Sequence, residues 1–348
     1  MKTLLKLVKL AQLASISLAM VAMFGCEPEE GITPQLQDAT SLAKGGQSQS
    51  QGVLRVPEEY ATIQLAVAAA KAGDHIHVSE GTYHHTVNII GAEKNNLQIL
   101  AVGKPGSVTI VGHHDFALDG GGAAFYLKDV SGVVIRGFVT RDFGYGPESA
   151  MGESFLLENA HNNRIEHNSM TASDMMGVTL WESANNRIAH NKIFLNDPDV
   201  VGRTGLGCGV HIQGAMAANN LIHNNEIWGN PFAGVMIRVA GAGNVIRENI
   251  IRDGSLWGVT NHETNGTKIV GNQIYGHQGL TVEKTLAPWF PPSLVGPGYG
   301  IDIQGSAGVE VINNKVYNNK TADIYWDGSN ENSFMKNTCD GGGFCNNL

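Results

Sequence analysis

Apolar and polar residues alternate in short segments along most of the chain, and these segments recur at a regular interval. The recurring unit places an aliphatic or aromatic residue three positions before an asparagine. Seven units follow this pattern: Ile165/Asn168, Ile188/Asn191, Ile222/Asn225, Ile246/Asn249, Ile269/Asn272, Val311/Asn314 and Phe334/Asn337. Successive units start 23, 34, 24, 23, 42 and 23 residues apart. A basic period near 23 residues, lengthened twice by insertions, is typical of a solenoid whose coils stack on one another.

Two short strand patterns make up each unit. In the first, which usually follows a glycine, the second and fourth residues are apolar. Four copies show it clearly: 177–181, 209–213, 234–238 and 300–304. Alternation with period two indicates a strand with one face in a core. The second pattern carries the Asn, and Asn side chains at stacked turns are expected to form a hydrogen-bonded ladder.

A helical solenoid does not explain these units, because no segment with a 3.6-residue period in them is longer than one turn. The one helical pattern lies before the repeats, from Tyr60 to Lys71, with Ile63, Val67 and Ala70 at helix spacing. A short helix there would cover the open edge of the first coil. We therefore predict an all-β fold, a single-stranded parallel β-helix with an N-terminal capping helix.

The first 26 residues are expected to lie outside the fold. Lys2, Lys6 and Lys9 precede a short apolar run, Leu10–Phe24, that ends at Gly25-Cys26. This pattern is typical of a bacterial lipoprotein signal, and it predicts lipidation of Cys26 and a membrane anchor. Ordinary secretion is the alternative.

The rest of the chain divides into two parts. Residues 27–52 are polar and are predicted to be a flexible linker, which leaves residues 53–348 for the β-helix. The protein is therefore expected in the cell envelope, anchored through its lipid, or secreted.

The net charge restricts the class of binding partner, and the cysteine spacing indicates a disulfide. The formal net charge is -9, and it becomes -12 once the three signal lysines are removed. An acidic exterior argues against nucleic acid as a partner. Cys339 and Cys345 lie six residues apart in a chain expected to be exported, so they are a candidate disulfide that would close the last coil. We expect a monomer.

The large insertions all precede one type of strand. From the ladder Asn to the next strand of the first pattern, the chain takes nine residues in plain coils, 18 after Asn191 and 28 after Asn272. An earlier coil has a long connection between Gly137 and Ser154. Insertions at one corner of a repeat protein usually surround a binding surface. We therefore expect function on the outward face of the sheet that these strands form.

Alternation places the third and fifth residues of each of these strands on that outward face. Parallel strands stack about 4.8 Å apart, so these residues form columns in which neighbours can touch. The centre of the columns collects Trp181, His211, Gln213, Arg238, His262, Asp302 and Gln304. Lys128 and Glu158 fall in the same columns in earlier coils. Amides for hydroxyls, Trp for a pyranose face and Arg for a carboxylate indicate a polysaccharide-binding groove.

The start of the repeat region resembles a known group of proteins. The segments Val56–Gln64, Ala72–Asp74 and Glu80–Tyr83 look like the opening of right-handed parallel β-helix proteins of the pectate-lyase-like superfamily, and the Asn-containing coils are similar to its repeats. The resemblance covers residues 53–348 and implies a right-handed β-helix. It implies less about activity, since the superfamily includes lyases, hydrolases, epimerases, adhesins and maturation factors. The motifs typical of polygalacturonases and mannuronan epimerases are absent from the sequence.

The residues of the predicted groove suit β-elimination at a uronate, which requires neutralisation of a carboxylate, a base and an acid. Arg238 would pair with the carboxylate and His211 would take the neighbouring proton. His262 would act as the acid or as a further substrate contact. Epimerisation shares the first half of this reaction. Hydrolysis requires two carboxylates across the scissile bond, and Glu158 and Asp302 do not form a neighbouring pair.

The insertions add candidate binding residues. Trp289 in the longest insertion and Tyr299 at its end would extend the substrate-binding wall. Asp197 and Asp199 in the middle insertion could help Asp302 to ligate calcium, although Asp-Pro-Asp is also an ordinary turn sequence. No other cofactor is indicated.

Two other functions stay open. The same surface could bind a glycan without catalysis, as part of a surface scaffold. The superfamily also contains periplasmic factors that assist copper-site assembly, but the sequence shows no Met or Cys cluster. We therefore expect an exported protein that acts on a uronan-like polysaccharide, as a lyase or an epimerase.

Overall fold

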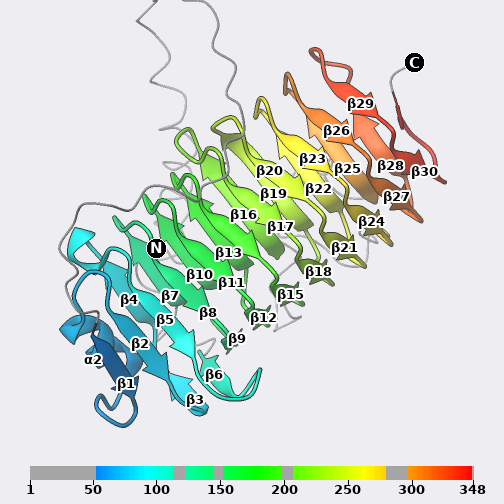
Figure 1. Ribbon diagram of the computed structural model, residues 1–348. Coiled ribbons are helices and arrows are strands. Elements are labelled where there is room, and N and C mark those ends of the chain that lie inside the picture. The colour runs from blue at the N-terminus through cyan, green and yellow to red at the C-terminus, as the bar shows by residue number, and fades with distance from the viewer. Residues whose placement is uncertain (1–51, 113–121, 145–151, 197–206, 280–296, 347–348) are drawn as a thin grey trace, which may run out of the picture. The chain divides into compact units, whose positions relative to one another are not determined.

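The computed structural model describes residues 52–112, 122–144, 152–196, 207–279 and 297–346. Within them nearly every regular element is a short strand, and the coils follow one another in chain order from the blue end to the red end of Figure 1. Strands pair in parallel with their equivalents one coil before and one coil after, as β13 does with β10 and β16. The fold is therefore a parallel β-helix solenoid, as the sequence predicts.

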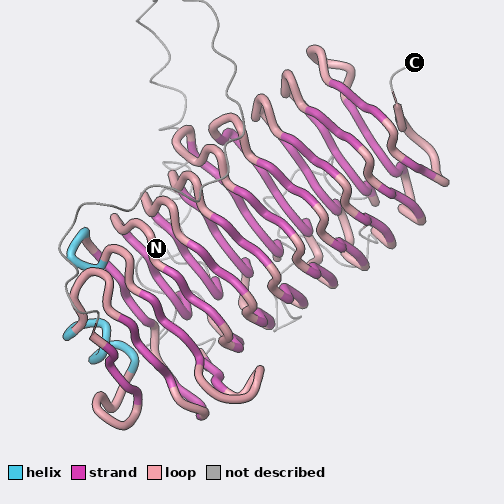
Figure 2. Tube along the Cα trace, viewed as in Figure 1, coloured by secondary structure: helices cyan, strands magenta, loops and turns pink. Residues whose placement is uncertain are grey.

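Three parallel sheets run along the stack of coils (Figure 2). Sheet A contains β1 (Val53–Val56), β2 (His75–Val78), β5 (Gln98–Ala101), β8 (Val134–Arg136), β11 (Arg164–Glu166), β14 (Arg187–Ala189), β17 (Leu221–His223), β20 (Val245–Arg247), β23 (Lys268–Val270), β26 (Glu310–Ile312) and β29 (Ser333–Met335). Sheet B contains β3 (Gly81–His84), β6 (Val108–Val111), β9 (Val139–Arg141), β12 (Ser169–Thr171), β15 (Lys192–Phe194), β18 (Glu226–Trp228), β21 (Ile250–Arg252), β24 (Gln273–Tyr275), β27 (Lys315–Tyr317) and β30 (Thr338–Cys339). Sheet C contains β4 (Val87–Ile90), β7 (Ala123–Lys128), β10 (Glu153–Glu158), β13 (Met176–Trp181), β16 (Cys208–Gly214), β19 (Ala233–Ala240), β22 (Trp257–His262), β25 (Tyr299–Gln304) and β28 (Ala322–Trp326).

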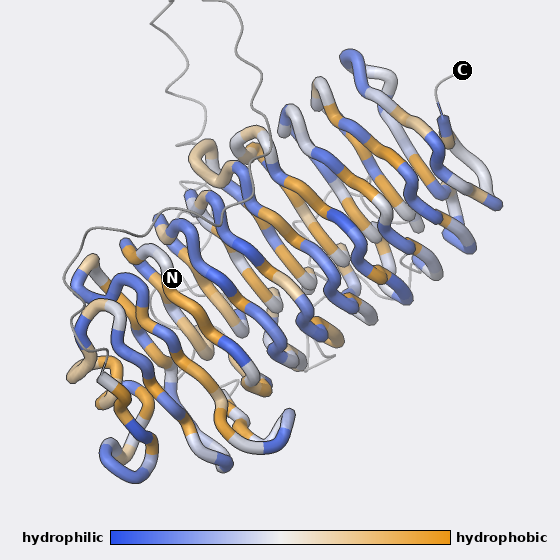
Figure 3. Tube along the Cα trace, viewed as in Figure 1, coloured by the Kyte–Doolittle hydropathy of each residue, from blue (hydrophilic) through white to orange (hydrophobic). Residues whose placement is uncertain are grey.

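Aliphatic residues from all three sheets fill the interior. In one coil these are Val178 and Leu180 of sheet C, Ile188 of sheet A and Ile193 of sheet B, all completely buried. Hydrophobic and hydrophilic residues accordingly alternate along the strands in Figure 3. Burying one such side chain stabilises the fold by about 2 kcal/mol, which makes the inward position the dominant constraint on each strand. The predicted inward direction of the second and fourth residues is confirmed.

The predicted asparagine ladder is present. Asn225 shows its geometry, because its Oδ1 accepts from the backbone N–H of Asn191 at 2.9 Å and from Asn191 Nδ2 at 3.0 Å. Its own Nδ2 donates to Asn249 Oδ1 at 3.0 Å and to the Ile188 carbonyl at 2.9 Å. Equivalent amide contacts join all seven anchor asparagines, and each buried amide is therefore satisfied by its neighbours.

A second ladder, which the sequence analysis did not identify, lies at another corner of the coil. Amide contacts of 3.0 to 3.2 Å join its four members in order: Asn163, Asn186, Asn220 and Asn244. Each of these residues lies two positions before an Ile anchor and directly before the first residue of a sheet A strand. The same chemistry therefore holds the coil at more than one corner, and Asn196 makes an equivalent contact with Asn230 at a third.

Both ends of the stack are covered. Helix α2 (Ile63–Ala69) is shorter than the predicted helix and begins after Thr62, whose Oγ1 accepts from the Leu65 N–H at 3.1 Å. Its buried residues, such as Ile63 and Val67, belong to the same core cluster as the first strands. At the other end, Cys339 and Cys345 form the predicted disulfide, with 6.1 Å between their Cα atoms.

The predicted signal and nearly all of the predicted linker, together with Cys26, lie outside the described residues. In the part of the chain that the structure does describe, no helix has the length and apolar character required to cross a membrane.

Candidate functional site on the outward face of sheet C

Sheet C presents one more outward column than simple alternation predicts. A Cβ atom on Gly209 would lie 2.5 Å from the Gly234 carbonyl oxygen and from Ile227 Cγ2, so this position faces the crowded interior. The register accordingly joins Cys208 and Val210 to their partners and skips the glycine. The residue before the glycine therefore lies on the outward side. Register aligns this column as Ala123, Glu153, Met176, Cys208, Ala233, Trp257, Tyr299 and Ala322.

The two predicted outward columns are present in the strand register. The third residues align as Tyr126, Leu156, Thr179, His211, Met236, Thr260, Asp302 and Tyr325. The fifth residues align as Lys128, Glu158, Trp181, Gln213, Arg238, His262 and Gln304. The structure thus brings the predicted site residues of five consecutive coils onto one face, with Lys128 and Glu158 two coils and one coil before them.

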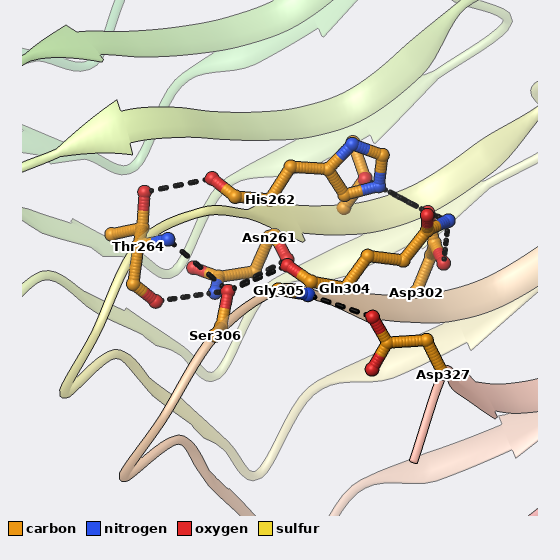
Figure 4. Close-up of polar contacts among 9 residues, drawn as sticks. Asn261, His262, Thr264, Asp302, Gln304, Gly305, Ser306 and Asp327 are labelled. Atoms are coloured by element: carbon orange, nitrogen blue, oxygen red, sulfur yellow. Dashed lines mark hydrogen bonds and ion pairs between the residues drawn. The ribbon is translucent and has the colours of Figure 1, made fainter. Parts of the chain in front are cut away.

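His262 and Asp302 form a hydrogen-bonded pair on this face (Figure 4). His262 Nε2 lies 2.7 Å from Asp302 Oδ2, although 40 residues separate them in the chain. Asp302 is fully buried and also accepts from Thr260 Oγ1 at 3.1 Å and from Gln304 Nε2 at 2.9 Å. Three donors from two adjacent strands therefore hold the carboxylate, and the carboxylate in turn orients the imidazole.

Asn261, the residue before His262, supports this strand from inside. It occupies a fourth position, where most other coils carry an aliphatic residue, and it is completely buried. Its Nδ2 donates to Ser306 Oγ at 2.9 Å and to the Thr264 carbonyl at 2.8 Å (Figure 4). Its Oδ1 accepts from Thr267 Oγ1 at 2.7 Å. A polar network in the core at this coil thus links the strand of His262 to the coil of Asp302.

Arg238 is the register neighbour of His262 and is exposed. Among the described residues it makes no ion pair with a carboxylate at 4.0 Å or less, in contrast to Arg164, Arg187 and Arg252 on other sheets. A guanidinium that forms no ion pair with the described carboxylates can receive a carboxylate of a ligand in bidentate geometry. Its position beside His262 agrees with the predicted columns.

His211 lies on the predicted face but is not open to solvent, which the sequence analysis did not anticipate. Its side chain is 4% exposed, and neither ring nitrogen makes a hydrogen bond of ordinary geometry within the described residues. The pKa of His211 is lowered to about 4, mainly by burial and also by the charge of Arg238, while the nearby Gln213 amide partly offsets both effects. The imidazole is therefore neutral near pH 7 and is covered rather than presented to a substrate.

Lys128 and Glu158 lie together at the N-terminal side of the face. Lys128 Nζ lies 2.8 Å from Glu158 Oε1, and the Tyr126 hydroxyl donates to the other oxygen of the same carboxylate. Burial and the Glu158 carboxylate raise the pKa of Tyr126 to about 12. Although burial opposes the effect, hydrogen bonds from Lys128 and Tyr126 lower the pKa of Glu158. The charge of Lys128 is thus neutralised by Glu158 within the protein.

The extra outward column adds a cluster of sulfur-containing and aromatic side chains. Met176 and Cys208 are neighbours in it, and Met236 of the third-residue column packs against the same cluster. Trp257 belongs to the cluster and meets the His262 ring edge to face at 5.9 Å. The sequence pattern does not predict these residues, because simple alternation does not place the residue before the glycine on the outward face.

Several predicted residues cannot be placed. Trp289, Asp197 and Asp199 lie outside the described residues. Among the residues that are described, no three or more His, Cys, Asp or Glu side chains are grouped as metal ligands. In the sequence, the four internal segments outside the described ranges each end just before a strand of sheet C, namely β7, β10, β16 and β25. The predicted calcium site therefore stays a prediction.

The three parallel sheets and their stacked coils define the class of protein, a parallel β-helix. The family model described as "Periplasmic copper-binding protein (NosD)" matches residues 152–342, and one described as "Protein of unknown function (DUF1565)" matches residues 45–242. Each match covers more than half of the chain, so the chain belongs to the NosD family and, in its N-terminal part, to the DUF1565 family. A search of curated proteins found no match.

Solved structures share the fold. An alginate lyase from Paenibacillus sp. str. FPU-7 is 16% identical with a TM-score of 0.52, over 84% of this chain and 96% of that one. The pectate lyase Pel9A is 17% identical with a TM-score of 0.45, over 80% of this chain and 70% of that one. The Azotobacter vinelandii mannuronan C-5 epimerase AlgE6 A-module is 15% identical with a TM-score of 0.44, over 80% and 93%. At these identities the alginate lyase supports the right-handed β-helix and nothing finer.

Proposed function

We propose that this protein is exported and acts on an acidic polysaccharide by removing the proton beside a uronate carboxylate. The observation that carries the proposal is the oriented His262–Asp302 pair next to Arg238, which forms no ion pair among the described residues, on one outward face. The names of several structures with this fold are those of polysaccharide lyases and an epimerase, which agrees with the chemistry but does not decide it.

His262 replaces His211 as the proposed base. When Nε2 carries the proton and donates to Asp302, Nδ1 keeps a lone pair and can accept a proton from the substrate. Arg238 would pair with the uronate carboxylate and stabilise the negative charge that develops as the proton leaves. His211 is covered and neutral, so it would support this face rather than exchange protons with the substrate.

Tyr299 is the proposed acid for the leaving oxygen. It is half-buried and stacks on Tyr325 with 4.7 Å between ring centroids. Burial raises the pKa of Tyr299, and the charge of Asp302 and the presence of Tyr325 raise it further, so the phenol keeps its proton near neutral pH. In β-elimination the proton from C5 would go to His262, the C4–O bond would break, and the leaving oxygen would take the phenol proton. An epimerase would instead return a proton to the other side of C5.

The test is release of unsaturated ends from a panel of uronate-containing polysaccharides, followed by ultraviolet absorbance and by product length. His262→Gln and Arg238→Gln should each abolish release while the fold is retained. His84→Gln is the matched control, because His84 is an exposed histidine on sheet B. A protein that is retained on polysaccharide but releases and epimerises nothing would be the glycan-binding alternative.

Export and lipid attachment belong to the same proposal. The description of the NosD family as periplasmic supports a location in the cell envelope. Replacing Cys26 by Ser should move the protein from the membrane fraction to the soluble fraction, and an unchanged distribution would contradict lipidation at this residue.

Copper handling is a second candidate function, because one observation favours it. Met175, Met176, Cys208 and Met236 pack in one cluster, and thioether and thiolate sulfur are ligands that Cu(I) prefers. The neutral His211 is the register neighbour of Met236. The family description points in the same direction.

Anaerobic titration with Cu(I) against a chromogenic chelator tests this function. Cys208→Ser and Met236→Leu should weaken binding, whereas Met335→Leu, at an exposed position on sheet A, should not. If the protein does not take Cu(I) from the chelator, the copper function is ruled out. Binding that all three variants leave unchanged would place the metal elsewhere in the chain.

A further inference from the structure

Charged side chains along the rim of sheet C form a pattern that the proposed chemistry does not use. The rim consists of the fifth-residue column, extended by Asp327 in the last coil. It also includes the residue that directly follows each member of that column. Among the described residues, the carboxylates of the rim are Asp129, Glu158, Glu182, Glu263 and Asp327. Its lysine and arginine residues are Lys128 and Arg238. The rim is therefore acidic, like the chain as a whole.

Several of these charges have partners within the protein. Lys128 pairs with Glu158 at 2.8 Å and is not free for a ligand. Asp327 accepts from the Gly305 N–H at 2.8 Å and from the Ser329 hydroxyl at 2.6 Å. Although burial opposes the effect, these hydrogen bonds lower the pKa of Asp327, so it stays ionised. Arg238 is thus the one unpaired lysine or arginine among the described residues of the rim.

The neighbours of Arg238 in the column carry no permanent charge. Gln213 lies one coil before it, with Trp181 before that, and His262 lies one coil after it, followed by Gln304. Amide side chains donate to and accept from hydroxyls, and an indole packs against an apolar sugar face. The column therefore offers one site for a carboxylate, with sites for neutral sugars on both sides.

A contiguous polyuronate does not match this pattern. Adjacent coils stack about 4.8 Å apart, and a 1,4-linked sugar chain lying along the column advances by a comparable distance per residue. Each further uronate would then place a carboxylate opposite a neutral residue or near Glu182, Glu263 or Asp327. Like charges brought together at an interface select against the wrong partner.

We infer that the substrate is an acidic heteropolysaccharide in which a single uronate is flanked by neutral sugars, and that contiguous polyuronates such as alginate and pectate are discriminated against. This inference rests on the proposed function for the identity of the site. It names the class of polysaccharide that the site accepts.

The experiment compares two kinds of glycan on the full-length protein at low ionic strength. Deacylated gellan has glucuronates separated by neutral sugars, whereas polygalacturonate and polymannuronate carry a uronate at every position. Affinity electrophoresis measures binding, and ultraviolet absorbance measures release of unsaturated ends. We expect at least about tenfold tighter binding of gellan, with the difference shrinking as salt screens the rim.

A matched pair of double variants tests the electrostatic cause. Glu182→Gln/Glu263→Gln removes two rim carboxylates and should tighten binding of polygalacturonate about threefold, with little change for gellan. Glu226→Gln/Glu310→Gln makes the same change of net charge on sheets B and A, and should change neither.

The outcomes separate the two proposals. If the protein prefers gellan but forms no unsaturated or epimerised product, the proposed class of ligand is supported and the proposed reaction is ruled out. Preferred binding or faster cleavage of a polyuronate would overturn the ligand class and leave the chemistry standing. Equal effects of the two double variants would also overturn it, because the rim would then play no part. If the protein binds none of the glycans in affinity electrophoresis, both proposals are contradicted.

Discussion

The imidazole of His262 and the carboxylate of Asp302 lie 2.7 Å apart on adjacent strands of sheet C, with the carboxylate fully buried and the imidazole partly exposed. Thr260 and Gln304 complete the coordination of the same carboxylate. A buried, multiply hydrogen-bonded acid that orients a more exposed base is the arrangement that general base catalysis requires.

Asp302→Asn should therefore lower kcat by about 100-fold or more, because an amide can bind His262 Nε2 as an acceptor or donor and no longer selects the tautomer with a free Nδ1. The measurement is the initial rate of the reaction found in the polysaccharide screen, with the Tm recorded in parallel. A rate near that of the native protein would remove Asp302 from the mechanism.

Asp323→Asn provides the comparison for a buried carboxylate on the same sheet. Asp323 accepts from the N–H groups of Asp340 and Gly341 and from Asn319, and so holds the C-terminal turn. This variant should lose stability with little change in kcat. A similar loss of rate in both variants would indicate that the sheet, and not the His262 pair, controls activity.

The solenoid could be predicted because its causes are local. Ile188 and Asn191 each obey a rule of spacing that repeats in every coil, and the disulfide of Cys339 and Cys345 follows from their proximity in sequence. The columns of the site followed from the same period. Burial of His211 did not, because a two-residue alternation tells inward from outward and says nothing about what covers an outward residue.

The outward direction of Cys208 and Trp257 also escaped the sequence analysis. It depends on the direction of the glycine that follows each of them, which faces the crowded interior and is a property of the packed coil. The pairing of His262 with Asp302 required the exact insertion lengths to be converted into register, with 40 residues between the two partners. Long-range polar pairs are therefore the part of the site that spacing alone could not supply.

The asparagine ladder should be a major source of stability. Asn225→Ala leaves the buried N–H and amide of Asn191 without their acceptor and the Ile188 carbonyl without its donor. Each unsatisfied buried group costs about 1–3 kcal/mol, so the free energy of unfolding should fall by about 3 kcal/mol or more. Urea unfolding followed by circular dichroism measures the change.

The neighbouring Asn224 offers a matched control. It is exposed, and its φ of 53° lies in the left-handed region that glycine adopts readily. Asn224→Gly should change the free energy of unfolding by less than about 0.5 kcal/mol. Equal losses in the two variants would show that the ladder contributes no more than a surface turn does.

The disulfide should stabilise the last coil more than the rest of the stack. Between its two cysteines, Phe344 packs against Phe334 and Trp326 with ring centroids 4.8 and 5.4 Å away, and its N–H donates to the Ile324 carbonyl at 2.9 Å. Closing so short a loop is worth about 2 kcal/mol.

Cys339→Ala/Cys345→Ala should therefore speed hydrogen exchange in β27 to β30 while β14 and β17 keep their protection. Addition of a reductant should reproduce this pattern in the native protein and do nothing further to the variant. Uniform loss of protection through all coils would mean that the terminal coil and the central coils unfold as one unit.

His211 should make the fold sensitive to acid. Its pKa lies at about 4 in the folded protein, below the ordinary value of 6.5, because its ring is buried and faces the charge of Arg238. Below pH 6.5 the unfolded chain takes up a proton that the folded protein refuses, so stability falls as the pH drops from 6.5 towards 4. This one residue lowers the free energy of unfolding by about 3 kcal/mol over that range.

His211→Leu should therefore flatten the decline of unfolding free energy between pH 7 and pH 4, whereas Met236→Leu, beside it in the column, should not. Equal pH dependence in His211→Leu and the native protein would show that the imidazole is protonated, or exposed, in the folded state.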